Sequence, residues 1–203
     1  MSVQNKPVPF GYKIAWLLFR SNDTDRVVDA LHLRDTQPVD WQTGISAAYA
    51  GQVVYVSPPV RGWVFAVGMP LFGASIDADR SMEPFKESLR KLSATFEEIQ
   101  AFASHRVSEY HHWVIVRNGN ISRSFAFCGE VGELWDDEGT KIADESSFVM
   151  DLDSDEYNPP DETSVMQVAG ACGIDPQSLE FEPPSNRLGV LGSVEMIGSS
   201  LCI

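Results

Sequence analysis

The chain has 203 residues, of which 43% are hydrophobic and 22% are charged, as is usual for a folded globular protein. Its 15 Lys and Arg residues stand against 29 Asp and Glu residues, which gives a formal net charge of −14 at pH 7. This excess of negative charge argues against binding to nucleic acid or to an anionic membrane, because both attract basic surfaces. All apolar runs are far shorter than the roughly 20 residues of a membrane span, and we expect a cytoplasmic protein.

The negative charge is concentrated in one part of the chain. Residues 130–162, here called the acidic segment, contain 13 acidic side chains and only Lys141, a net charge of −12. Two interpretations remain open: a solvated face that keeps the protein soluble, or a surface that attracts a cationic partner. Clustering favours the second, because solubility alone does not require the charges to be adjacent.

The first half of the chain alternates predicted strands and helices. Ser21, Asn22 and Asp23 offer caps for a short helix that ends near Leu33. Further on, Phe85, Leu89, Leu92 and Phe96 form one apolar stripe of a helix that Ser81 can cap. We expect strands at 12–20, 52–57 and 62–68, a short helix at 41–49, and loops at Thr36-Gln37-Pro38 and 70–79.

The second half is rich in predicted strands. Asn118-Gly119-Asn120 indicates a tight hairpin, because Asn and Gly both accept positive φ. In the return strand we expect Ile121, Arg123, Phe125 and Phe127 to share one face. The remaining predicted elements are strands at 99–107, 110–117, 121–128 and 129–135, a turn at Asp136-Asp137-Glu138-Gly139, a loop at Asp151–Pro160, and a helix capped within 161–163 that ends at Gly173.

These elements define an α+β protein with a mostly antiparallel sheet packed against two or three helices. Residues 1–182 form the expected compact domain, with 73–80 as the place where a subdivision would fall. Two similar α/β halves are an alternative arrangement of the same elements. The Gly- and Ser-rich residues 183–203 are either a terminal strand or a mobile tail.

Three of the four histidines lie within eight residues, at His105, His111 and His112. On a strand His111 and His112 point to opposite faces, so they cannot share one metal ion. Acid–base chemistry by His105 or His111 with Glu130 is the enzymatic alternative. Asp151, Asp153, Asp155 and Glu162 imitate a calcium loop, but Glu156 stands where that loop needs glycine. We therefore expect no metal and no cofactor.

Three stretches resemble a family of small, uncharacterised bacterial cytoplasmic proteins: Ser57–Val64 (SPPVRGWV), His105–Trp113 (HRVSEYHHW) and Gly129–Glu133 (GEVGE). In general type the chain is similar to bacterial immunity proteins that neutralise toxins. This similarity implies a non-enzymatic protein that occludes the active site of a basic toxin or effector. A ligand-binding regulatory domain is the third alternative. The expected contact residues are Asp136, Asp137, Glu138, Asp151, Asp153, Asp155 and Glu156.

Overall fold

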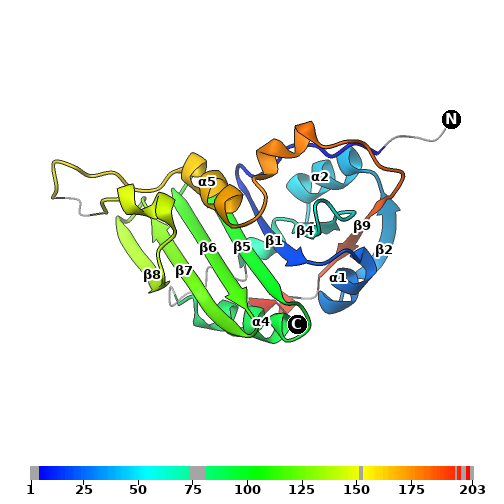
Figure 1. Ribbon diagram of the computed structural model, residues 1–203, viewed down its shortest axis with the longest axis horizontal. Helices are drawn as coiled ribbons and strands as arrows, with labels where there is room; N and C mark the ends of the chain where they lie inside the picture. Colours follow the sequence, from blue (N-terminus) through cyan, green and yellow to red (C-terminus); the bar gives the residue numbers. More distant parts are fainter. Residues whose placement is uncertain (1–4, 74–80, 151–152, 195, 198–199, 202–203) are drawn as a thin grey trace.

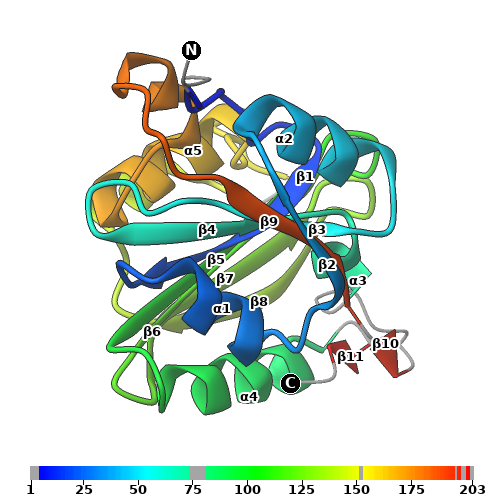
Figure 2. The same cartoon turned by 90° about the vertical axis from the view of Figure 1, so that its right-hand side faces the viewer.

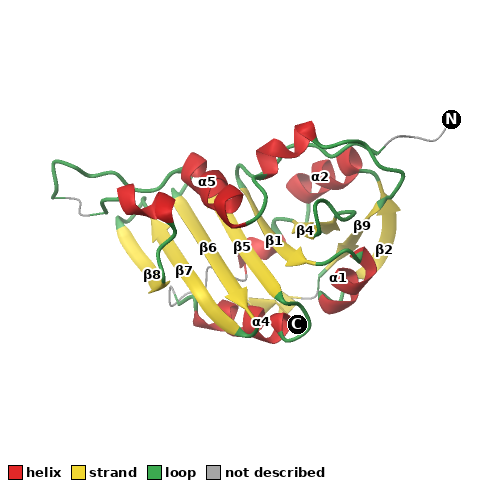
Figure 3. Ribbon diagram, in the orientation of Figure 1, coloured by secondary structure: helices red, strands yellow, loops and turns green. Residues whose placement is uncertain are grey.

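An antiparallel sheet of nine strands organises the protein, as Figures 1 and 3 show for the computed structural model. The structure describes residues 5–73, 81–150, 153–194, 196–197 and 200–201. The strand order is β2-β9-β3-β4-β1-β5-β6-β7-β8. The strands are β1 (Ile14–Arg20), β2 (Arg34–Val39), β3 (Val54–Val56), β4 (Trp63–Val67), β5 (Glu98–His105), β6 (Tyr110–Arg117), β7 (Asn120–Cys128), β8 (Glu133–Gly139) and β9 (Gly189–Ser193). A separate small ladder joins β10 (Met196–Ile197) to β11 (Ser200–Leu201).

Helices cover both faces of this sheet, and Figure 2 shows the sheet between them. On one face lie α1 (Thr24–Ala30), α3 (Pro70–Gly73) and α4 (Glu83–Ser93), which contribute Val27, Leu71 and Leu89 to one core. On the other face lie α2 (Trp41–Ala50) and α5 (Glu162–Cys172), with the 3₁₀ helices η1 (Ala143–Ser147) and η2 (Pro176–Phe181). The expected α+β class with antiparallel strands is confirmed.

Strand β1 lies at the centre of the sheet and contributes to both cores. Ala15, Leu17 and Phe19 pack on the α4 side, whereas Trp16 and Leu18 pack on the α5 side. Burial on both faces explains why this strand is a continuous apolar run rather than an alternating one.

The predicted hairpin between β6 and β7 is confirmed. Asn118 and Gly119 have φ values of 47° and 78°, and Arg117 pairs with Asn120 across the two-residue turn. The predicted face of Ile121 is wrong, because the register shifts between Ile115 and Val116. This irregularity places Ile121 against the α4-side core, although Phe125 and Phe127 lie on the α5 side.

Two other predictions are wrong at the edges of the sheet. The expected loop at 36–38 lies within β2, and the expected turn at 136–139 lies within β8. These strands are the outermost ones in the described part of the sheet, where proline and charged residues are tolerated. For residues 183–203 the sequence left open a strand or a mobile tail. The structure forms a strand, because β9 pairs with both β2 and β3.

Helix α2 approaches β3 closely at a glycine. Gly44 is buried, and a Cβ added there would overlap the ring of Tyr55. A Cβ on Gly189 in β9 would overlap the same ring. The absence of side chains at these two positions allows Tyr55 to fill the space between α2 and the sheet.

We expect Gly44→Ala to destabilise the protein by roughly 1–3 kcal/mol, because overpacking outweighs the better helix propensity of alanine. Urea denaturation followed by circular dichroism measures the free energy of unfolding. The matched control is Ser46→Ala on the exposed face of the same helix, which should change stability little. If Gly44→Ala costs as much in a Tyr55→Leu background, the close contact with the Tyr55 ring is not the cause.

Candidate functional site

The acidic segment surrounds one end of the sheet. It forms β8, η1, a projecting loop and the start of α5, and Figure 1 shows the loop extending beyond β8. Val149 and Asn158 close this loop: the amide of Val149 donates to the carbonyl of Asn158 at 2.9 Å, and the reverse bond is 2.7 Å long. The side chain of Asn158 also donates to the carbonyl of Ser147 at 2.9 Å. We call the connection between Val149 and Asn158 the acidic loop.

The described acidic side chains of this loop face solvent. Asp153, Asp155 and Glu156 are exposed. Ser154 organises the turn that presents them, since its hydroxyl accepts from the amide of Glu156 at 3.1 Å and its carbonyl accepts from the amide of Tyr157 at 3.1 Å. The predicted contact residue Asp151 lies outside the described residues.

The predicted contact residues in β8 form ion pairs with cations of the protein itself. Lys86 pairs with two of them on the α4 side of the sheet. The Nζ atom of Lys86 in α4 lies 3.2 Å from Asp136 and 2.8 Å from Glu138. Burial alone would lower the pKa of Lys86, but the hydrogen bonds to these two carboxylates outweigh burial and raise the pKa. Much of the negative charge of β8 is therefore compensated internally.

On the α5 side of the sheet, Arg123 makes the corresponding contacts. Its Nε donates to Oε2 of Glu145 at 2.7 Å, and its Nη1 donates to Asp137 at 2.6 Å. The side chains of Arg123 and Glu145 are each only 2% exposed. Trp113 completes the group by donating from Nε1 to Glu145 at 2.7 Å. This buried group attaches η1 to the sheet and thus sets where the acidic loop begins.

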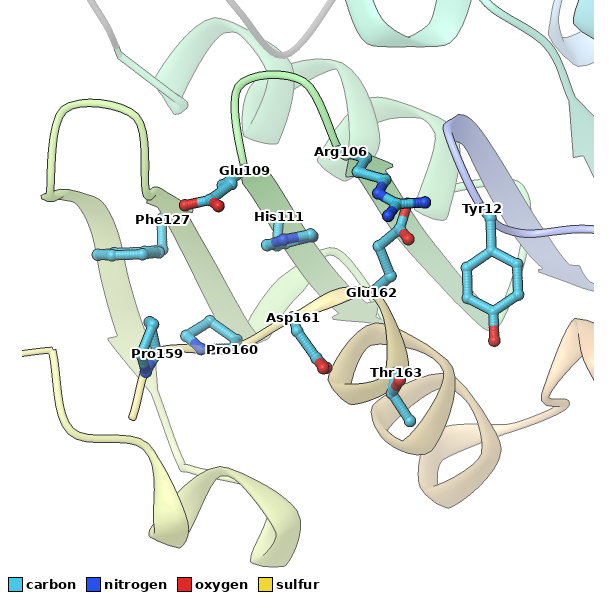
Figure 4. A pocket seen from close by; sticks show the side chains of 10 residues that line it. All are labelled: Tyr12, Arg106, Glu109, His111, Phe127, Pro159, Pro160, Asp161, Glu162 and Thr163. Atoms are coloured by element: carbon cyan, nitrogen blue, oxygen red, sulfur yellow. The ribbon is translucent and has the colours of Figure 1, made fainter. Parts of the chain in front are cut away.

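A pocket of about 510 Å³ lies between the β5–β6 turn and the start of α5 (Figure 4). Arg106 and Glu109 come from the turn, and His111 comes from β6. Asp161 caps α5 by accepting from the amide of Ser164 at 2.8 Å. We call this cavity the His111 pocket; it is lined by Tyr12, Arg106, Glu109, His111, Phe127, Pro159, Pro160, Asp161, Glu162 and Thr163.

His111 is the most deeply buried polar side chain of this pocket, with 3% of its surface exposed. Its Nδ1 atom has no hydrogen-bond partner within the described part of the chain. Burial lowers its pKa to about 4, an effect that Asp161 opposes and His105 reinforces. The imidazole is therefore neutral at pH 7.

The structure separates the members of the enzymatic alternative. His105 lies on the opposite face of the sheet from His111, against Phe72, with Nδ1 2.7 Å from the hydroxyl of Ser108. Glu130 is exposed in the turn after β7 and does not line the His111 pocket. The carboxylates that do line it are Glu109, Asp161 and Glu162. In the sequence, Asp161 and Glu162 indicated a helix start, and nothing in their spacing relates them to a histidine 50 positions earlier.

Comparisons with family models, with curated proteins and with solved structures found no match for this chain. Among the described residues, no three His, Cys, Asp or Glu side chains form a group that could hold a metal ion. No helix in the same ranges is long and apolar enough to cross a membrane.

Acid should destabilise the protein through its buried histidines. Burial lowers the pKa of His112 to about 3, and the repulsion of His111 adds to this effect. The unfolded chain takes up protons below about pH 6.5, whereas folded His112 stays neutral until about pH 3. Each buried histidine thus contributes its full stabilisation above pH 6.5, and this contribution decreases as the pH falls. The free energy of unfolding then drops by on the order of 1 kcal/mol per pH unit for each histidine. We expect His112→Phe to flatten the dependence of unfolding free energy on pH between 5 and 6.5.

The control for this measurement is His32→Asn, because His32 is exposed and asparagine accepts its φ of 49°. That variant should keep the slope of the unmodified protein. If the free energy of unfolding changes equally steeply with pH in His112→Phe and in the unmodified protein, burial of His112 does not cause the pH dependence.

We further expect Glu145→Gln to destabilise the protein by roughly 3–5 kcal/mol, because it leaves the buried guanidinium of Arg123 without its main counterion. Glu130→Gln removes the same charge from an exposed turn and should change stability by less than about 0.5 kcal/mol. Urea denaturation of both variants makes the comparison. Similar losses in the two variants would mean that burial of the Arg123–Glu145 pair contributes little.

Proposed function

We propose that this chain is a non-enzymatic binding protein of the toxin-immunity type, acting in the cytoplasm on a basic protein partner. The observation that carries the proposal is the exposure of Asp153, Asp155 and Glu156 on a loop that projects from the sheet. In this role the loop covers the partner's active site and blocks it sterically, while complementary charge accelerates association.

The pairing pattern supports this choice of surface. Asp136, Asp137 and Glu138 in β8 already contact Lys86 or Arg123. A partner's cations would have to compete with these internal contacts in β8, whereas Asp155 and Glu156 are exposed on the projecting loop. The acidic loop is therefore the part of the segment best placed to attract a basic protein from a distance.

Apolar side chains at the same end of the sheet can provide contact area. Tyr157 in the acidic loop is 37% exposed, and Val131 and Leu134 beside and within β8 are each 44% exposed. Aromatic and aliphatic anchors near charged groups are typical of the residues that contribute most to protein–protein affinity.

The test compares two variants with equal net charge. The loop variant carries Asp153→Asn, Asp155→Asn and Glu156→Gln, and the control carries Asp29→Asn, Asp35→Asn and Glu180→Gln at exposed sites elsewhere. Each has a net charge of −11 in place of −14. A partner captured from the source cells is then purified, and its association rate is measured against ionic strength. We expect the loop variant to associate about tenfold more slowly at low salt, with a weaker salt dependence and little change in dissociation.

The inhibitory role is tested in cells that produce the captured partner. Co-production of the unmodified chain or the control should restore growth, and co-production of the loop variant should restore it less. If the loop variant and the control associate equally fast, the acidic loop is not the interface. If the partner does not impair growth, or if the chain gives no protection, the protein is not of the immunity type.

A further inference from the structure

The His111 pocket is a second negative feature, distinct from the acidic loop. Three carboxylates line it, those of Glu109, Asp161 and Glu162, against the single guanidinium of Arg106. They come from the β5–β6 turn and from the start of α5, elements that lie more than 50 residues apart in the chain. With His111 neutral, the charged side chains of the lining sum to −2.

The buried imidazole supplies an independent indication of a ligand. His111 is 97% buried, yet its Nδ1 has no partner among the described residues. A buried polar atom without a hydrogen bond destabilises a fold. Figure 4 shows the ring between the side chains of Arg106 and Glu109, with the start of α5 across the cavity. Less than 1 Å² of this atom is accessible, so the ring must turn about its Cβ–Cγ bond before an unprotonated Nδ1 can accept a hydrogen bond from a ligand in this space.

The chemistry of the lining selects the kind of ligand. Carboxylates and an unprotonated imidazole nitrogen all accept hydrogen bonds, so they suit a group that is positively charged and rich in N–H donors. The net negative charge of the lining would repel an anion. A volume of about 510 Å³ lies within the range usual for small-molecule sites and is ample for an arginine or lysine side chain.

We propose that the His111 pocket binds an ammonium or guanidinium group, which donates hydrogen bonds to the carboxylates of Asp161 and Glu162 and, once the ring has turned, to Nδ1 of His111. This site does not depend on the proposed immunity function. The cation is carried either by a free small molecule or by a lysine or arginine side chain of a protein, and the hydrogen bonds are the same in both cases.

The probe is agmatine, a small molecule with one guanidinium and one ammonium group, titrated into the isotopically labelled full-length protein. Long-range proton–nitrogen NMR spectra report on the ring nitrogens of His111 directly. We expect agmatine to shift the Nδ1 signal of His111 in a saturable way, and inorganic phosphate to leave it unchanged.

A charge-neutralising double variant tests the carboxylates without removing the helix cap. Asp161→Asn keeps a capping oxygen at α5, and Glu162→Gln keeps an acceptor near the hydroxyl of Ser104. The matched control is Asp175→Asn with Glu180→Gln, which changes the cap of η2 and an exposed neighbour by the same charge. We expect the dissociation constant for agmatine to rise about tenfold or more in the first variant and to stay unchanged in the control.

His111→Phe should abolish binding, and circular dichroism shows whether that variant is folded. If His111→Phe is not folded, the comparison of the double variant with its control tests the proposal. The proposal is overturned if agmatine leaves the His111 signals unmoved, if phosphate moves them instead, or if the double variant and its control bind agmatine equally. Comparison with the peptide acetyl-Gly-Arg-Gly-amide then distinguishes the two sources: stronger binding of the peptide assigns the site to a protein side chain, and stronger binding of agmatine assigns it to a small molecule.

Discussion

The buried ion pair between Arg123 and Glu145 determines how the acidic segment lies on the protein. Two charges that are each 2% exposed are stabilised here by their contacts with each other and by hydrogen bonds with Trp113 and Asp137. The pair joins three elements, since Arg123 belongs to β7, Asp137 to β8 and Glu145 to η1. It adds side-chain contacts to the β7–β8 ladder and attaches η1, from which the acidic loop continues, to the sheet.

This arrangement divides the acidic segment into two parts with different physical roles. The carboxylates of β8 compensate the cations Lys86 and Arg123, one on each face of the sheet. The described carboxylates after Glu145 point outward, toward solvent in the acidic loop or toward a cavity at the start of α5. A net charge counted along the sequence cannot distinguish these roles, because it contains no information about which cation each carboxylate meets.

Local signals in the sequence predicted the elements whose cause is local. Asn118-Gly119 determines its own turn, and Asp161 caps α5 through an amide three residues away. The predictions for 36–38 and 136–139 were wrong because proline and acidic residues also suit a strand at the edge of a sheet, and edge position depends on the whole topology. The pairing of Arg123 with Glu145 spans 22 residues. An arginine among the aromatic residues of a buried strand was the available sign that an internal counterion exists.

The position of β9 has a consequence for how the protein acquires its structure during synthesis. Residues 189–193 lie between β2 and β3, which belong to the first third of the chain. Until those residues have left the ribosome, β2 has no partner in the described sheet, and β3 is paired on one side only. The part of the sheet from β4 to β8 can assemble earlier, from strands that are closer in sequence. The closure of the first part must then wait for residues 189–193, and such long-range pairing is slow to form.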